Sequence, residues 1–189
     1  MKPDIGAPAV SGPLPRAATP DDAAEIARLR SDFVLSEPLD AAWLAVCRAQ
    51  IAARLRPGAD ARAFVVDGPA GGLVACALAF IQPVLPGPGY PRGLAARIHA
   101  VATEPAHRRR GLARAALAAL LKQLEEDGVT LYELHASETA APLYEEVGFR
   151  RDAALMLMTK APALHRGEVG PRSTSDACCT PTPCSRTER

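Results

Sequence analysis

The chain has 189 residues, of which 48% are hydrophobic, and its 22 Lys and Arg residues almost balance 21 Asp and Glu residues. The resulting net charge of +1 argues against a general nucleic-acid-binding protein, which needs a broad basic face. There is no apolar run of the roughly 18 residues that a transmembrane helix needs, and the N-terminus has no apolar signal segment. We therefore expect no nucleic-acid or membrane partner and a cytoplasmic location.

The composition predicts one domain with two disordered ends. Residues 1–15 are rich in proline and are expected to form a disordered leader. Residues 162–189 carry Pro, Ser, Thr and Arg without apolar periodicity and are expected to form a disordered tail. The segment between them, 16–161, has the length of an ordinary domain.

Two helices are predicted first. Thr19 precedes a proline and two aspartates, a pattern that starts helices, and apolar residues then recur at helical spacing through Phe33. A second helix is expected from about Asp40 to Leu55, ending at Arg56-Pro57-Gly58. The apolar side of this second helix is expected to comprise Trp43, Val46, Cys47, Ile51 and Leu55.

Strands then alternate with helices. Strands are predicted at 63–67, 73–81 and 97–103, and the nearly continuous apolar run at 73–81 predicts a central strand covered on both faces. A proline-rich loop at 82–93 separates the last two strands. A helix at 111–127, a strand at 129–137, a short helix at 139–147 and a last strand or strand pair at 149–159 complete a mixed α/β domain.

Three arginines at 108–110 stand before Gly111, between an apolar strand and an alanine-rich helix. The first N–H groups of a helix lack acceptors within it and lie at the positive end of its dipole, so such a helix start binds phosphate. A Walker loop is absent, and a Rossmann turn would follow the first strand rather than the third. The turn therefore predicts a phosphate-bearing cofactor held outside both nucleotide-binding folds.

The segment Arg108-Arg109-Arg110-Gly111-Leu112-Ala113, preceded by Val101-Ala102-Thr103-Glu104-Pro105, resembles the central motif of the GCN5-related N-acetyltransferase (GNAT) family. At the usual distance, Ala140, Leu143-Tyr144-Glu145 and Gly148-Phe149 resemble the C-terminal segment of the family. The resemblance covers residues 16–161. It implies a mixed, mostly antiparallel sheet flanked by helices, in which a splayed pair of strands holds acetyl-CoA.

The resemblance also implies how acetyl-CoA is held. Backbone N–H groups of 109–114 would bind the pyrophosphate, and the open edge of the strand at 101–103 would pair with the pantetheine arm. A backbone N–H near Val101 or Ala102 would stabilise the oxyanion. Ser137 stands where many family members have an asparagine, and its hydroxyl reaches less far. The implied cofactor contacts are Val101, Ala102, Thr103, Arg108, Arg109, Arg110, Gly111, Leu112, Ala113, Arg114 and Ser137.

Two residues are the candidates for acid–base chemistry. Tyr144 matches the family tyrosine that donates a proton to the leaving thiolate. His99 precedes Val101 by two residues on the same strand, so it is expected on the same face and is the candidate base. His135, Glu133 or a water molecule are the alternatives for the base. In the purely structural alternative, Tyr144 and His99 are core residues.

The leading prediction is direct transfer of an acetyl group to the amine of an acceptor, which is expected to be a small molecule rather than a protein. Cys47 and Cys76 lie away from the motifs, which disfavours a covalent acetyl-enzyme. Segments 26–57 and 82–93 are expected to select the acceptor. Glu37 and Asp40 either meet a cationic amine there or simply flank the helices in solvent.

Two other classes of protein are weighed against this one. The first is a non-catalytic CoA-binding or regulatory module that keeps the phosphate turn. The second is a zinc or redox protein using Cys178, Cys179 and Cys184, but their spacing fits no zinc pattern, so no metal is expected. Dimerisation is common in the family, although no sequence feature demonstrates a homodimer here.

Overall fold

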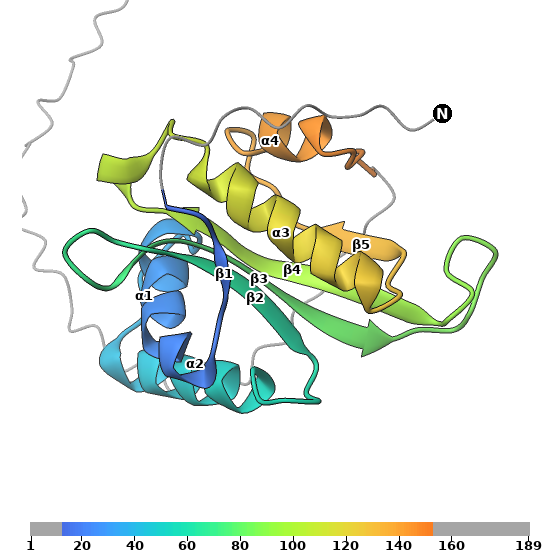
Figure 1. The fold of residues 1–189 in the computed structure, drawn as a ribbon, viewed down its shortest axis with the longest axis horizontal. Coiled ribbons are helices and arrows are strands. Elements are labelled where there is room, and N and C mark those ends of the chain that lie inside the picture. The colour runs from blue at the N-terminus through green and yellow to red at the C-terminus, as the bar shows by residue number, and fades with distance from the viewer. Residues whose placement is uncertain (1–12, 153–189) are drawn as a thin grey trace, which may run out of the picture. The chain divides into compact units, whose positions relative to one another are not determined.

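The computed structural model describes residues 13–152 (Figure 1). The chain divides after Arg150 into two units, and the helices and strands described here lie in the first. Five strands form one sheet in the order β1-β2-β3-β4-β5, antiparallel except for the parallel pair β4–β5. The strands are β1 Arg16–Ala17, β2 Ala61–Asp67, β3 Leu73–Pro83, β4 Leu94–Thr103 and β5 Leu131–Leu134. The predicted mixed, mostly antiparallel sheet is confirmed.

Helices cover both faces of this sheet (Figure 1). The helical segments are the 3-10 turn η1 Pro20–Asp22, α1 Ala23–Phe33, α2 Ala41–Arg54, the 3-10 turn η2 Pro105–His107, α3 Leu112–Glu126 and α4 Ala141–Glu146. Helices α1 and α2 pack on one face, and α3 crosses β2, β3 and β4 on the other. Among the described residues, no helix is long and apolar enough to cross a lipid bilayer.

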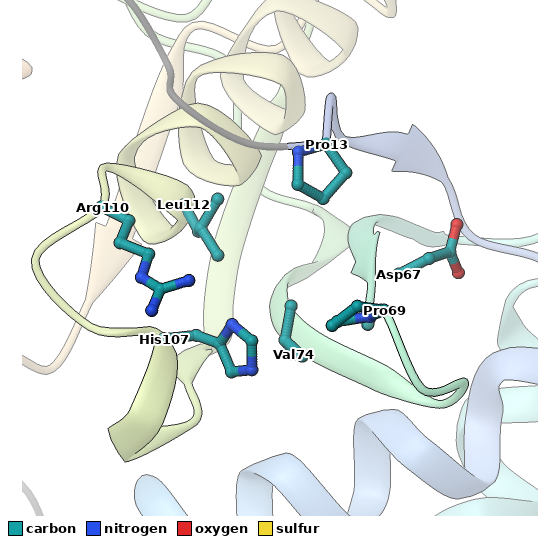
Figure 2. Close-up of a pocket in the computed structure, with 8 residues that line it drawn as sticks. Pro13, Asp67, Pro69, Val74, His107, Arg110 and Leu112 are labelled. Carbon is teal, nitrogen blue, oxygen red and sulfur yellow. The ribbon is translucent and has the colours of Figure 1, made fainter.

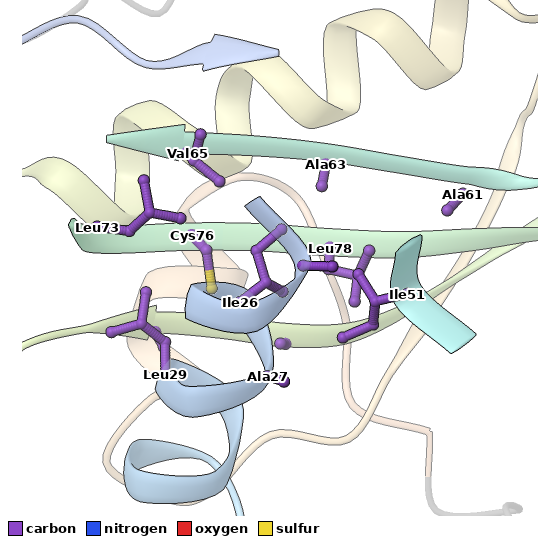
Figure 3. Packing of buried hydrophobic residues seen from close by; sticks show 13 residues of the cluster. Ile26, Ala27, Leu29, Ile51, Ala61, Ala63, Val65, Leu73, Cys76 and Leu78 are labelled. Atoms are coloured by element: carbon purple, nitrogen blue, oxygen red, sulfur yellow. The ribbon is translucent and has the colours of Figure 1, made fainter. Parts of the chain in front are cut away.

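Strand β3 is the centre of the sheet, as its apolar sequence predicts. All residues from Leu73 to Ala79 are buried, because one cluster of side chains covers each face of the strand. The α1/α2 cluster includes Ile26, Leu29, Cys76 and Leu78 (Figure 3). Each fully buried aliphatic side chain of this kind contributes about 1.5–3 kcal/mol relative to exposure.

The predicted apolar side of α2 is wrong for two residues. Trp43 is 54% exposed and Val46 is 45% exposed, whereas Ile51 is buried and Cys47 and Leu55 are partly buried. The predicted set spans about half of the helix circumference at roughly 100° per residue. The helix touches the core along a narrower arc, so the residues at the far edge of the predicted stripe face outward.

The ends of several elements also differ from the prediction. The helix predicted at Thr19 begins as η1, where the Asp22 carboxylate accepts a hydrogen bond from the Thr19 N–H at 2.7 Å. Strand β5 is shorter than the predicted 129–137, and 149–152 carry no strand. Four predicted features lie wholly or mostly outside the described residues. They are the leader, the rest of the last predicted strand, the domain end at 161 and the C-terminal cysteines.

Candidate functional site

Strands β4 and β5 part halfway along β4. Residues from Ala95 to Ile98 pair with β5, from Leu131 to Leu134. Beyond Ile98, β4 continues to Thr103 beside β3, but within residues 13–152 no strand pairs with its other edge. Unpaired backbone N–H and C=O groups of a strand edge can bind an extended ligand as an added strand.

A β-bulge lies at the point where the two strands part. Leu78 is opposite Ala100 and Ala79 is opposite Ile98, so His99 is an extra residue in β4. A bulge breaks the alternation of side chains. Val101 consequently packs on the α3 face, whereas the His99 ring lies 4.5 Å from the ring of Phe80, which belongs to the α1/α2 face. The prediction that His99 and Val101 share a face is wrong for this reason.

The arginine turn follows β4 and ends at the start of α3. Arg109 and Gly111 both have left-handed backbones, with φ of 62° and 77°. The first hydrogen bond of the helix runs from Ala115 N–H to Gly111 O at 2.9 Å. The N–H groups of Leu112, Ala113 and Arg114 come before Ala115, the first residue whose N–H is paired within the helix, so they lie unpaired by it at its positive end. A Cβ built on Gly111 meets nothing within 4 Å, so the space outside the turn is open.

The arginine side chains at and just after the turn differ in their contacts. Arg108 Nε donates to the carbonyl of Thr103 at 3.2 Å, and its guanidinium lies 5.8 Å from the centre of the Phe33 ring. Arg114 forms an ion pair with Glu146 of α4. Arg109 and Arg110 have no ion-pair partner among residues 13–152 and are exposed. These two side chains therefore carry the free positive charge beside the helix start.

Helix α1 holds the base of this turn in place. Arg28 forms ion pairs with Glu25 at 2.9 Å and with Glu104 at 2.8 Å, and it also donates to the carbonyl of Leu73 at 3.1 Å. The Glu104 N–H in turn donates to Val74 O at 2.9 Å. Because Glu104 directly follows β4, these contacts link α1, β3 and the start of the turn.

A cavity of about 490 Å³ lies on one side of the turn (Figure 2). Arg110, His107 and Leu112 line it on one side, and the end of β2 with the β2–β3 turn lines it on the other. None of its lining residues comes from β5 or α4. The cavity therefore does not involve the strand pair that parts after Ile98, and Arg110 of the turn borders it.

Tyr144 of α4 is buried, at 8% exposure, on the α3 face. Its ring lies edge-on to Phe149, with the centroids 6.0 Å apart. Burial raises the pKa of the Tyr144 hydroxyl above its usual value, so it is protonated at neutral pH. Tyr144 therefore retains a proton to donate, as an acid must.

Ser137 and Thr103 lie near the ends of the two parting strands. Ser137 is exposed, its hydroxyl lies 3.0 Å from that of Thr139, and its carbonyl accepts from the N–H groups of Ala140 and Ala141. Thr103 Oγ1 is buried without a hydrogen-bond partner in the described part of the chain. An orphaned hydroxyl at the end of an unpaired strand edge fits a site that is completed by a ligand.

The candidate bases differ in their surroundings. Burial and then the charges of Arg97, Arg30 and Arg54 lower the pKa of His99 to about 4. His135 Nε2 lies 2.9 Å from Arg97 Nη2, and because a guanidinium can only donate, this nitrogen accepts. Glu133 is exposed on β5, opposite Arg97 in register. His99 is therefore neutral at pH 7, and Arg97 occupies the free lone pair of His135.

Cys76 lies closer to the motifs than the sequence indicates, because it is opposite Ala102 in the pairing of β3 with β4. Its thiol is completely buried, and burial raises its pKa to about 12. A thiol that does not ionise is a poor nucleophile. Residues 13–152 contain no cluster of three or more His, Cys, Asp or Glu residues that could hold a metal ion.

Comparisons with known proteins agree with this geometry. A GCN5-related N-acetyltransferase from Ralstonia eutropha JMP134 is 25% identical, with a TM-score of 0.64 over 79% of this chain and 97% of its own. An acetyltransferase from Trypanosoma brucei is 26% identical, with a TM-score of 0.59 over 77% of this chain and 98% of its own.

A third structure, a predicted acetyltransferase from Clostridium acetobutylicum solved with acetyl-CoA, is 19% identical, with a TM-score of 0.67 over 77% of this chain and 94% of its own. Curated protein sequences give no significant match. The model of the acetyltransferase (GNAT) family matches residues 27–149. The chain therefore belongs to the GNAT acetyltransferase family.

Proposed function

We propose that the protein is an N-acetyltransferase that transfers an acetyl group directly from acetyl-CoA to the amine of a small molecule. The parting of β4 from β5 beyond Ile98, in line with the arginine turn and the start of α3, carries this proposal. The strand edge would pair with the amide groups of the pantetheine arm. The free N–H groups at the start of α3, with Arg109 and Arg110, would bind the phosphates.

The chemistry then needs an acid and a base. In direct transfer, the amine nitrogen forms a bond to the thioester carbonyl carbon and the C–S bond breaks, so the departing sulfur needs a proton. Tyr144 is our candidate for this proton, because it is protonated at neutral pH and belongs to the same side-chain cluster as Val101 of β4 and Leu134 of β5. A backbone N–H near Val101 or Ala102 would stabilise the oxyanion.

The amine must also lose a proton. His99 at the bulge is the candidate base, with His135, Glu133 or water as the alternatives. A pKa of about 4 makes His99 a weak base in the protein alone, so its environment has to change when the acceptor binds. The buried Cys76 thiol supports direct transfer over an acetylated cysteine.

Two measurements on the full chain test the proposal. Calorimetry with acetyl-CoA should show micromolar binding, and a thiol reagent should then detect CoA released in the presence of an amine panel. Absence of acetyl-CoA binding by a folded protein would refute the proposal. Binding without turnover of any amine would favour the non-catalytic CoA-binding module instead.

A further inference from the structure

Charged and polar side chains surround the ring of Phe80, on the α1/α2 face of the sheet, near the point where β4 and β5 part. Phe80 of β3 lies directly opposite Arg97 of β4 in the strand pairing. The guanidinium of Arg54, the last residue of α2, lies 4.4 Å from the centre of the Phe80 ring. The His99 ring lies 4.5 Å from the same ring. We call these four residues, Phe80, Arg54, Arg97 and His99, the arginine cluster, and include Arg30 because its charge acts on the His99 ring.

The arginine cluster reaches across the opening between the strands. The hydrogen bond from Arg97 to His135 joins β4 to the segment that follows β5, where the strand pairing has ended. This hydrogen bond holds the Arg97 side chain at the level where β4 and β5 part. His99 occupies the bulge at the same level of the sheet. The cluster therefore borders the end of the β4 edge at which a bound thioester would meet its acceptor.

Positive charge in this cluster exceeds the negative charge that faces it. Arg54 pairs with Asp60 at 3.0 Å. Arg30 and Arg97 are only partly exposed, yet neither has a carboxylate partner among residues 13–152. Glu133 lies opposite Arg97 in register, but no ion pair joins the two. Partly buried guanidinium groups usually have an anionic partner, and the described part of the chain supplies none to Arg30 or Arg97.

The charges of the three arginines act on the His99 ring. Burial is the main cause of the low pKa of His99, and the charges of Arg97, Arg30 and Arg54 lower it further. These three arginines come from β4, α1 and α2, so the tertiary structure brings together positions far apart in the sequence. A site where several positive charges act together favours an anion.

We propose that the arginine cluster binds a carboxylate or phosphate group of the acceptor, so that the preferred acceptors are small amines that also carry a negative charge. This inference rests on the proposed acetyltransferase function and names the substrate class of the same site. Arg97 would hold the anion through charge-assisted hydrogen bonds, and the positive charge of Arg30 would add to its attraction. The acceptor amine would then be presented to the thioester beside the bulge.

The bound anion would also assist the proton transfer. The amine proton has to pass to a base as the C–N bond forms, and the sulfur takes its proton from Tyr144. A negative charge among the arginines offsets their field at His99 and makes the imidazole a better proton acceptor. His99 would therefore be a competent base only with an anionic acceptor in place, whereas a neutral amine would leave it weakly basic.

Matched pairs of amines test the preference in the thiol-release assay. The pairs are O-phosphoethanolamine with ethanolamine, glucosamine 6-phosphate with glucosamine, and β-alanine with β-alanine amide, which separate phosphate from carboxylate. We expect kcat/KM to favour the charged member of at least one pair by about tenfold or more. Arg97→Gln and Arg30→Gln should each remove that preference mainly by raising the acceptor KM, with the KM for acetyl-CoA unchanged.

Arg48→Gln is the matched control, because Arg48 is an exposed arginine of α2 that has no ion-pair partner among residues 13–152, and its charge is not among those that lower the His99 pKa. This variant should keep the preference. Equal or better use of the neutral amines by the wild-type protein would overturn the inference and leave the acetyltransferase proposal standing.

A second measurement needs no turnover. The protein is first saturated with CoA, so that added anions do not compete for the arginine turn. Inorganic phosphate or acetate should then give the wild type and Arg48→Gln a higher thermal midpoint than chloride does at equal ionic strength. The same anions should not do so in the Arg30→Gln/Arg97→Gln double variant. No shift in the wild type would overturn the inference, whereas failure to bind CoA would overturn the proposed function beneath it.

Discussion

Replacement of Gly111 by aspartate or asparagine isolates the electrostatic part of acetyl-CoA binding. Gly111 has a φ of 77°, and a Cβ there meets nothing within 4 Å, so neither side chain is excluded by contact. Aspartate and asparagine tolerate the left-handed backbone about equally and both are good N-terminal caps. The two variants therefore differ at the start of α3 by one negative charge and little else.

The expected magnitude follows from Coulomb's law. With an effective dielectric constant of ~40 and a separation of ~6 Å, one negative charge opposes another by about 1.4 kcal/mol, so two phosphate charges are opposed by about 3 kcal/mol. This corresponds to about 100-fold weaker binding at low salt, because 1.4 kcal/mol is about a factor of ten. A Debye length of about 8 Å at physiological salt roughly halves the effect, to about tenfold.

The assay is calorimetric titration of acetyl-CoA into wild type, Gly111→Asn and Gly111→Asp at two salt concentrations. Circular dichroism melts should show both variants folded, with Asp at least as stable as Asn because a negative charge at a helix start is favourable. Equal affinity of the two variants at low salt would refute the placement of the phosphates at this turn. A gap that did not shrink with salt would refute the electrostatic explanation.

Three further predictions concern single residues. Tyr144→Phe should lower kcat by roughly 100-fold with the KM for acetyl-CoA unchanged, and an unchanged kcat in steady-state assays would remove the hydroxyl from the acid role. The His99 ring should titrate near pH 4 when followed by NMR. Because its pKa is lower in the folded than in the unfolded protein, the free energy of unfolding should fall as the pH drops from about 6.5 towards 4. Denaturation of His99→Gln should show a smaller fall over the same range. Arg28→Met should lower the free energy of unfolding by about 1–3 kcal/mol in urea, since it leaves Glu104 and Leu73 O without their partner; a change below about 0.5 kcal/mol would contradict the anchoring role.

Local patterns in the sequence predict much of this fold. The apolar run from Leu73 predicts the central strand because a strand covered on both faces has no polar side. The spacing of apolar residues from 111 to 127 predicts a buried stripe of Ala113, Ala116, Leu117, Leu120, Leu121 and Leu124. Ala116, Leu117, Leu120 and Leu124 are buried, because helical spacing is fixed by the backbone itself, whereas Ala113 and Leu121 are partly exposed. The buried side predicted for α2 is wrong at Trp43 and Val46, because the width of the buried side of a helix depends on what the helix packs against.

Part of the candidate site also follows from local sequence, and part depends on the tertiary structure. A turn, a glycine and a helix start are neighbours in the chain, so the sequence by itself determined the arginine turn, the start of α3 and the family. Which face His99 occupies depends on a bulge, and a bulge is set by how β4 pairs with a strand about twenty residues away. Arg30, Arg54 and Arg97 show no shared pattern along the chain. Only the packing of α1 and α2 on the sheet decided that the charges of these three arginines act together on His99, because long-range strand register and helix placement leave no local periodicity in the sequence.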